Sequence, residues 1–208
     1  MAAVVALADL LEARSVWRGP ARAPVAPAEH PTGFAALDAC LPGGGWPAAS
    51  LSEVLIPADG VGELSLVLPT LARLTRTGRR IVVVAPPYCL HAPGWHNAGV
   101  ALAQVEIVEA PTPKEALWAA EQCLRSAACG AVLCWPLKAD DRSLRRLQVA
   151  AETGQALGFA FRESRQARNP SPAALRLQLD ARGRCLRILK CRGGLAPPSP
   201  VAFEPPWH

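Results

Sequence analysis

The sequence predicts an α/β fold in which helices flank a mainly parallel sheet and an antiparallel hairpin forms one edge. Short apolar runs such as residues 81–85 alternate with helical patterns, as in parallel strands that are covered on both faces. A glycine loop at residues 57–62 follows one such run and leads into a helix. Two strictly alternating segments, 174–179 and 185–190, flank a glycine-containing turn, which predicts the hairpin, with 174–179 as a half-exposed strand.

Length and composition favour one globular domain. The chain has 208 residues, of which 50% are hydrophobic and 19% are charged, so it can bury a sizeable core. No apolar run reaches the roughly 20 residues of a membrane helix, and the first residues lack the features of a secretory signal. We therefore expect a cytoplasmic protein. The seven cysteines form no C-x-x-C pair, so neither a zinc nor a redox motif is indicated.

The predicted domain organisation has three parts. Residues 1–30 comprise an amphipathic helix over 4–14 and a linker rich in proline and alanine, 31–195 form the core domain, and 196–208 form a proline-rich tail. The amphipathic helix is compatible with packing on its own domain or on a partner.

The core begins with a short helix at 32–38, for which Thr32 is the expected cap, and a glycine turn at 41–47. The first strand covers 53–56. The helix after the glycine loop is expected from Glu63 to about Thr77, with Pro69 kinking it or delaying its start.

Further strands and helices alternate along the rest of the core. Trp118 and Trp135 are expected in the core, whereas Trp46 and Trp95 lie in expected loops as candidate partner anchors, together with Trp17 and Trp207. The remaining strands are predicted at 81–85, 105–109, 129–135 and 157–162, the helices at 113–126 and 142–153, and a short helix or loop at 93–100.

The glycine loop has the layout of a phosphate-binding P-loop without its chemistry. Such a loop needs a lysine for the phosphates and a serine or threonine for Mg²⁺, and here Glu63 and Leu64 follow the last glycine. A carboxylate repels a triphosphate, and leucine cannot ligate a metal ion. The degenerate loop consists of Pro57, Gly60, Gly62, Glu63 and Leu64.

The acids that would support phosphoryl transfer are also missing. The strand at 81–85 ends in two prolines, and the strand at 129–135 ends in Trp135 and Pro136. Asp140 and Asp141 follow shortly after, so a displaced acid stays open as an alternative. We expect no catalytic residues, no cofactor and no ATPase activity. His91, His96 and Cys89 match no standard metal site, and no metal is expected.

Basic residues gather in three places and are the candidate binding residues for DNA or an acidic protein surface. The alternative interpretation is ordinary solvated charge. The candidates are Arg142, Arg145, Arg146, Arg162, Arg165, Arg168, Lys190 and Arg192.

Several motifs in their order and spacing resemble known proteins. Thr32-Gly-Phe-x-x-Leu-Asp38, then Gly43-Gly-Gly-Trp-Pro47, then Glu53-Val-Leu before the glycine loop resemble the RecA recombinase core. Segments 116–126, 130–136 and 144–148, with Leu189-Lys-Cys-Arg-Gly-Gly194, are more similar to the ImuA family, RecA-like proteins related to the SulA division inhibitors. The resemblance covers roughly residues 30–195.

The resemblance implies a RecA-like fold and a non-catalytic adaptor in SOS-induced translesion DNA synthesis. Its partners would be an ImuB-like protein, RecA and an error-prone polymerase subunit, with recruitment to damaged DNA in the nucleoid and self-association through RecA-like surfaces. In RecA-like proteins the loop equivalent to 162–168 faces DNA. The alternatives are a SulA-like cell-division inhibitor, a divergent nucleotide-binding ATPase and a plain DNA-binding module.

Overall fold

A single eight-stranded sheet forms the centre of the molecule. The computed structural model describes residues 30–136, 139–180, 182 and 184–203, and places the strands in the order β3-β2-β4-β5-β1-β6-β7-β8. The strands are β1 (Leu51–Ile56), β2 (Arg80–Val84), β3 (Val105–Val108), β4 (Cys129–Cys134), β5 (Leu157–Glu163), β6 (Leu175–Leu179), β7 (Cys185–Cys191) and β8 (Val201–Ala202).

The pairing confirms the predicted mainly parallel sheet. All contacts from β3 across to β6 are parallel, whereas β7 pairs antiparallel with both β6 and β8. The chain segments 174–179 and 185–190 therefore form the predicted hairpin. One detail was wrong: β6 is almost fully buried instead of half exposed, because it lies inside the sheet between β1 and β7.

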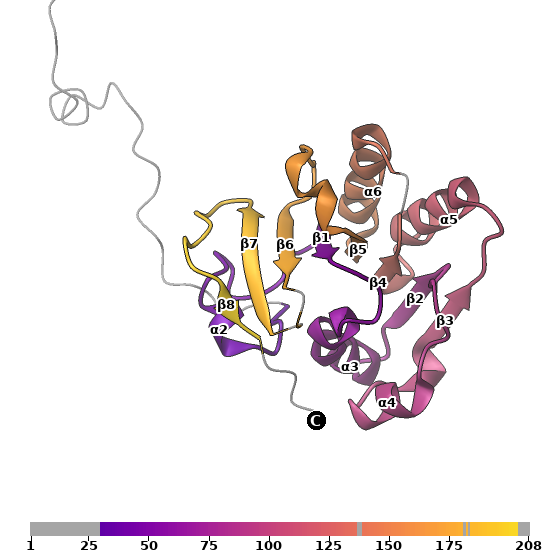
Figure 1. Cartoon of the computed structure of the whole chain (residues 1–208). Coiled ribbons are helices and arrows are strands. Elements are labelled where there is room, and N and C mark those ends of the chain that lie inside the picture. Colours follow the sequence, from indigo (N-terminus) through magenta and orange to yellow (C-terminus); the bar gives the residue numbers. More distant parts are fainter. Residues whose placement is uncertain (1–29, 137–138, 181, 183, 204–208) are drawn as a thin grey trace, which may run out of the picture.

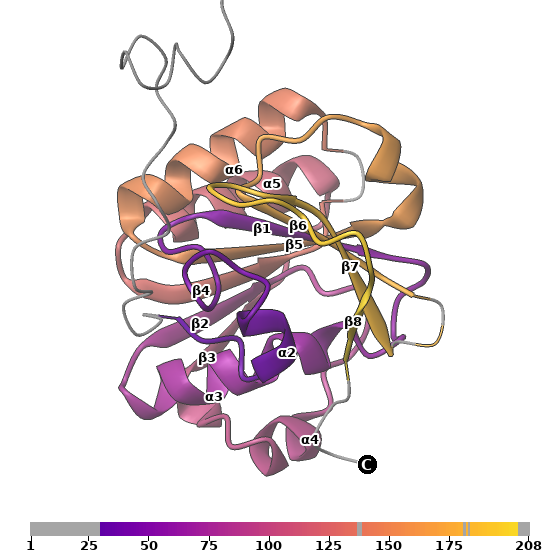
Figure 2. The ribbon, with the colours of Figure 1, turned by 90° about the vertical axis from the view of Figure 1, so that its left-hand side faces the viewer.

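Helices cover both faces of the sheet (Figures 1 and 2). Helices α5 and α6 lie on one face, and α2, α3 and α4 lie on the other. The helices are α2 (Ala35–Asp38), α3 (Leu68–Arg76), α4 (Ala92–Asn97), α5 (Pro113–Arg125) and α6 (Asp141–Gly154), with short 3₁₀ turns η1 (Glu63–Leu66), η2 (Leu102–Gln104) and η3 (Ser164–Arg168).

The two faces have separate apolar cores. The larger core joins Leu37 of α2, Leu71 of α3 and Trp95 of α4 to the sheet. The smaller core joins Leu124 of α5 and Leu147 of α6 to the opposite face. Since both faces are covered, the central strands read as continuous apolar runs in the sequence.

Two element boundaries differ from the prediction. The segment from Glu63 first forms η1, and α3 begins only at Leu68, with Pro69 in its first turn, where the missing amide hydrogen of proline costs no helical hydrogen bond. Proline therefore delays the helix, as expected. Phe34, not Thr32, occupies the N-cap position of α2, and the Thr32 hydroxyl accepts a hydrogen bond from the Phe34 amide at 3.1 Å.

The segment expected to be a tail also contributes to the sheet. Val201 and Phe203 are buried, and the edge strand β8 lies within 196–208. The predicted helix at 4–14, Trp17 and Trp207 lie outside the described residues. No helix in the described part is both long and apolar enough to cross a membrane.

Candidate functional site

The loop between β1 and η1 follows a strand as predicted, but the turn η1 separates it from the helix α3. Two of its glycines are required by the backbone conformation. Gly60 and Gly62 have φ angles of +79° and +97°, in the left-handed region that glycine adopts without strain. Space around both α-carbons is open. The loop follows the carboxyl end of β1, which is where ligands bind in open α/β sheets.

Glu63 fills this loop from inside. Its side chain is buried, and its Oε1 accepts hydrogen bonds from the Gly60 amide at 3.0 Å and from the Tyr88 hydroxyl at 2.6 Å. In a P-loop, backbone amides of this kind cradle phosphate oxygens. Here the Glu63 carboxylate, instead of a phosphate, accepts the hydrogen bond from the Gly60 amide.

The surroundings of Glu63 are apolar and acidic. Burial, and then the hydrogen bond to Glu63, raise the pKa of Tyr88 well above its ordinary value, so the phenol keeps the proton that it donates. Burial also raises the pKa of Asp59, with further contributions from the charges of Glu63 and Glu163. The carboxyl groups of Glu63 and Asp59 thus lie close together at the loop, and their charge would repel a phosphate group.

Aromatic side chains occupy the neighbouring strand ends. Trp135, directly after β4, stacks on Phe161 with ring centroids 5.0 Å apart and meets Tyr88 edge-on at 5.9 Å. The position expected for a metal-binding acid is thus part of the apolar core. The strand β2 is followed by Ala85 and Pro86, which carry no acid group.

Asp140, one of the two residues considered as a displaced catalytic acid, caps a helix. Asp140 is the N-cap of α6, and its Oδ1 accepts a hydrogen bond from the Ser143 amide at 2.8 Å. Hydrogen bonds from Ser143 hold the pKa of Asp140 below its ordinary value. A carboxylate committed to this cap satisfies a free backbone donor of the helix.

Arg162 is not a surface residue, which corrects its place among the candidate binding residues. It is buried, and its guanidinium donates to Glu53 at 2.6 Å and to the Ala139 carbonyl at 2.7 Å. Arg176 of β6 contacts the second Glu53 oxygen at 2.5 Å. A buried carboxylate on β1 thus holds two arginines from the flanking strands.

The other candidate cations differ in how far they are engaged. Contacts are present for Arg146 with Glu121, Arg165 with Glu163, Arg192 with Glu152, and Lys190 with the Ser171 carbonyl. Arg142 lies near Asp140. Neither the Arg145 nor the Arg168 side chain forms a hydrogen bond or ion pair with another described residue. The link from Arg162 to Ala139 brings the start of α6 and η3 to the same edge of the sheet.

The tryptophan predictions were partly reversed. Trp135 is buried as predicted, but Trp118 is 61% exposed instead of part of the core. Trp46 and Trp95, the candidate anchors, are buried, and the Trp46 Nε1 donates to the Thr70 hydroxyl at 2.9 Å. In the described part of the chain, no group of three or more His, Cys, Asp or Glu side chains is arranged to hold a metal ion.

Sequence reasoning missed two residues at this edge, Glu53 and Tyr88. Glu53 carried a usable signal, because a charged residue inside the run 51–56 has to be paired when that run is a buried strand. Tyr88 follows two prolines in a loop, and no local pattern indicates that it contacts Glu63.

Comparisons with known proteins point to one family. A family model described as "Cell division inhibitor SulA" matches residues 50–158, which is more than half of the chain. Among solved structures, the crystal structure of SulA from Pseudomonas aeruginosa is similar at 28% identity, with 56% of this chain and 99% of that chain covered and a TM-score of 0.47. A search of curated proteins found no match.

Proposed function

The chain belongs to the SulA family, and from this premise we propose that it is a non-catalytic adaptor that acts by binding other proteins in the SOS response to DNA damage. The observation that carries the proposal is the position of Glu63. Its buried carboxylate accepts the Gly60 amide at 3.0 Å, so the loop is filled by the protein's own negative charge. Because the Glu63 side chain occupies the loop in which a nucleotide would bind, we infer that the protein acts by binding other proteins.

Within this role, the ImuA-type function is our first candidate. The segments similar to the ImuA family extend past the family match to residues 189–194, and the strands β6, β7 and β8 lie beyond residue 158. We infer that this added sheet edge serves an adaptor with several partners. They would be an ImuB-like protein, RecA and an error-prone polymerase subunit.

A division-inhibitor function is the second candidate, and the description of the matching family favours it. In that case the partner would be the tubulin-like division protein. The matched region 50–158 contains the filled loop and the α5–α6 face, so either surface is available to such a partner.

Co-purification distinguishes the two candidates. The full chain would be expressed with an affinity tag together with RecA, an ImuB-like protein or the tubulin-like division protein, each in a separate culture and with a tag-only control. Retention of RecA or the ImuB-like protein supports the adaptor in translesion synthesis. Retention of the division protein alone supports the inhibitor, and failure to retain any of the three contradicts the proposed function.

A further inference from the structure

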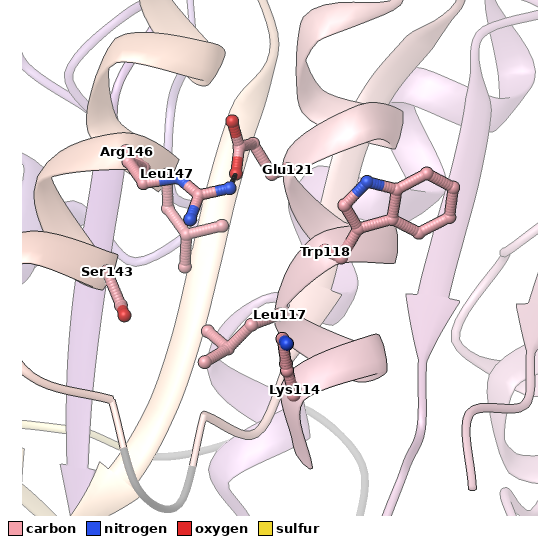
Figure 3. Close-up of a pocket in the computed structure, with 7 residues that line it drawn as sticks. All are labelled: Lys114, Leu117, Trp118, Glu121, Ser143, Arg146 and Leu147. Atoms are coloured by element: carbon pink, nitrogen blue, oxygen red, sulfur yellow. Dashed lines mark hydrogen bonds and ion pairs between the residues drawn. The ribbon is translucent and has the colours of Figure 1, made fainter. Parts of the chain in front are cut away.

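The outer surface of α5 and α6 has a hollow of about 150 Å³ between the two helices (Figure 3). Its floor consists of Leu117 from α5 and Leu147 from α6. Trp118 lines it from α5 and is 61% exposed, and Figure 3 shows its indole ring directed away from α6, on the other flank of α5. A large aromatic side chain left in water beside an apolar hollow is typical of a protein-binding anchor.

The charges around the hollow are mainly positive. Its lining includes the cations Lys114 and Arg146 and one carboxylate, Glu121. Glu121 is buried and already forms ion pairs with both Arg125 and Arg146. Its charge is therefore satisfied within the protein, and the surplus at the hollow is positive.

Glu121 also fixes the direction of the Arg146 guanidinium. The pair joins α5 to α6 across the groove, and Figure 3 shows the guanidinium directed toward Glu121 above the two leucines. The Arg146 side chain remains 57% exposed, so further N–H groups of its guanidinium are available to a partner. A guanidinium held in this way loses little side-chain entropy when it binds a carboxylate.

These features lead us to propose that the α5–α6 hollow docks an acidic segment of a partner protein, with an apolar side chain in the hollow and flanking carboxylates on Lys114 and Arg146. The apolar floor suits an aliphatic or aromatic side chain. The charge at the rim is complementary to acidic residues on either side of it. This inference rests on the proposed function only in requiring that the protein acts by binding proteins.

A protein segment fits this surface better than nucleic acid does. A phosphate backbone is recognised through rows of cations, whereas the lining of this hollow has two cations, Lys114 and Arg146, and a carboxylate, Glu121, that would repel phosphates. The side chains of Leu117 and Leu147 have neither a positive charge nor a hydrogen-bond donor for a phosphate. Stacking of a base on Trp118 is the competing interaction, and the test includes it.

Fluorescence anisotropy with labelled synthetic probes tests the proposal on the full chain. The main probe is a short peptide of glutamates around one central leucine. Its three controls are the same peptide with a central glycine, a lysine peptide with a central leucine, and a single-stranded DNA oligonucleotide. We expect measurable binding of the glutamate–leucine peptide and at least about tenfold weaker binding of each control.

Two variants locate the binding. Trp118→Ala and Lys114→Glu should each weaken binding of the main probe about tenfold, since one removes exposed aromatic surface beside the hollow and the other reverses a rim charge. Two control variants change residues elsewhere and should leave binding unchanged. Ile107→Ala on β3 alters an apolar side chain that is 55% exposed, and Arg187→Glu on β7 alters an exposed cation. Thermal unfolding of each variant confirms that the fold is retained.

Three results would overturn the docking surface: no binding of the main probe, equal binding of the glycine peptide, or DNA binding that depends on Trp118. If partners still co-purify in that case, the proposed function stands and only this surface is wrong. If no partner co-purifies but the probe binds through Trp118, the surface stands and the proposed partners are wrong.

Discussion

Glu53 is the most consequential single residue of the sheet. It lies fully buried on β1, with Arg162 at 2.6 Å on one side and Arg176 at 2.5 Å on the other. Both arginines also donate to backbone carbonyls of 139, 166 and 169. One carboxylate thereby ties the strands β5, β1 and β6 to the segments that follow β4 and β5.

Replacing Glu53 should strongly destabilise the protein. Glu53→Ala leaves two buried guanidinium groups without their shared counter-charge, and breaking a buried ion pair in this way typically costs about 3–5 kcal/mol. Urea unfolding measures the loss in the free energy of unfolding. The matched control is Glu106→Ala, whose exposed pair with Arg80 should contribute at most about 1 kcal/mol. Equal effects of the two substitutions would contradict the structural role of Glu53.

At the scale of single residues, the sequence predicts chemistry better than exposure. The mismatch of Glu63 with a P-loop is visible in the sequence, because it depends on residue type at a fixed spacing. The burial of Arg162 and the exposure of Trp118 cannot be seen in the sequence, because they depend on strands and helices that are distant in the chain. Arg162 faces Glu53, which lies 109 positions away.

Among the secondary-structure elements, β8 shows how a weak sequence pattern can belong to the core. It has only two residues and follows a stretch rich in proline and glycine, which predicts an extended tail. Yet the Phe203 amide donates to the Arg184 carbonyl at 2.8 Å, and the Phe203 ring packs edge-on against Phe34 with centroids 4.8 Å apart. The end of the described chain therefore secures the start of the core at α2.

Phe203→Ala should accordingly destabilise the fold by about 3–5 kcal/mol, since the ring is fully buried and its removal leaves a cavity against Phe34. Leu195→Ala is the control, because that side chain is 94% exposed and its loss should change the free energy of unfolding by less than about 0.5 kcal/mol. Chemical denaturation compares both. A loss below about 1 kcal/mol for Phe203→Ala would mean that the C-terminal strand is dispensable.

The longer elements were predictable for a physical reason. Buried parallel strands produce continuous apolar runs, and helices on their faces produce a 3.6-residue period, so β2, β4, α5 and α6 are found close to their expected positions. Neither the strand order nor the burial of β6 follows from local pattern. Both depend on which strands pair, and that is decided by the packing of the whole sheet.

For the whole molecule, the candidate site is a convergence of elements. The filled loop follows β1, Tyr88 follows β2, Trp135 follows β4, and Glu163 ends β5. All four meet at the carboxyl edge of the parallel sheet, where a ligand would bind in a protein of this architecture. Apolar and acidic side chains now fill that edge. The residues that differ from those of a nucleotide-binding site thus come from four separate parts of the chain, which follow or end β1, β2, β4 and β5.

This distribution leads to a prediction for the variant in which Glu63→Lys and Leu64→Thr restore the two missing P-loop residues. We expect no ATP hydrolysis above background, because no added group activates the attacking water or replaces the metal-binding acid at Trp135. Phosphate release from the purified variant, compared with the unaltered chain and with a known P-loop ATPase, measures this. Thermal unfolding must show that the variant is folded, since Glu63→Lys removes the acceptor of the Gly60 and Tyr88 hydrogen bonds. Robust hydrolysis by the double variant would show that a carboxylate such as Asp141, next to the cap at Asp140, supplies the missing acid, and it would overturn the interpretation of this edge as non-catalytic.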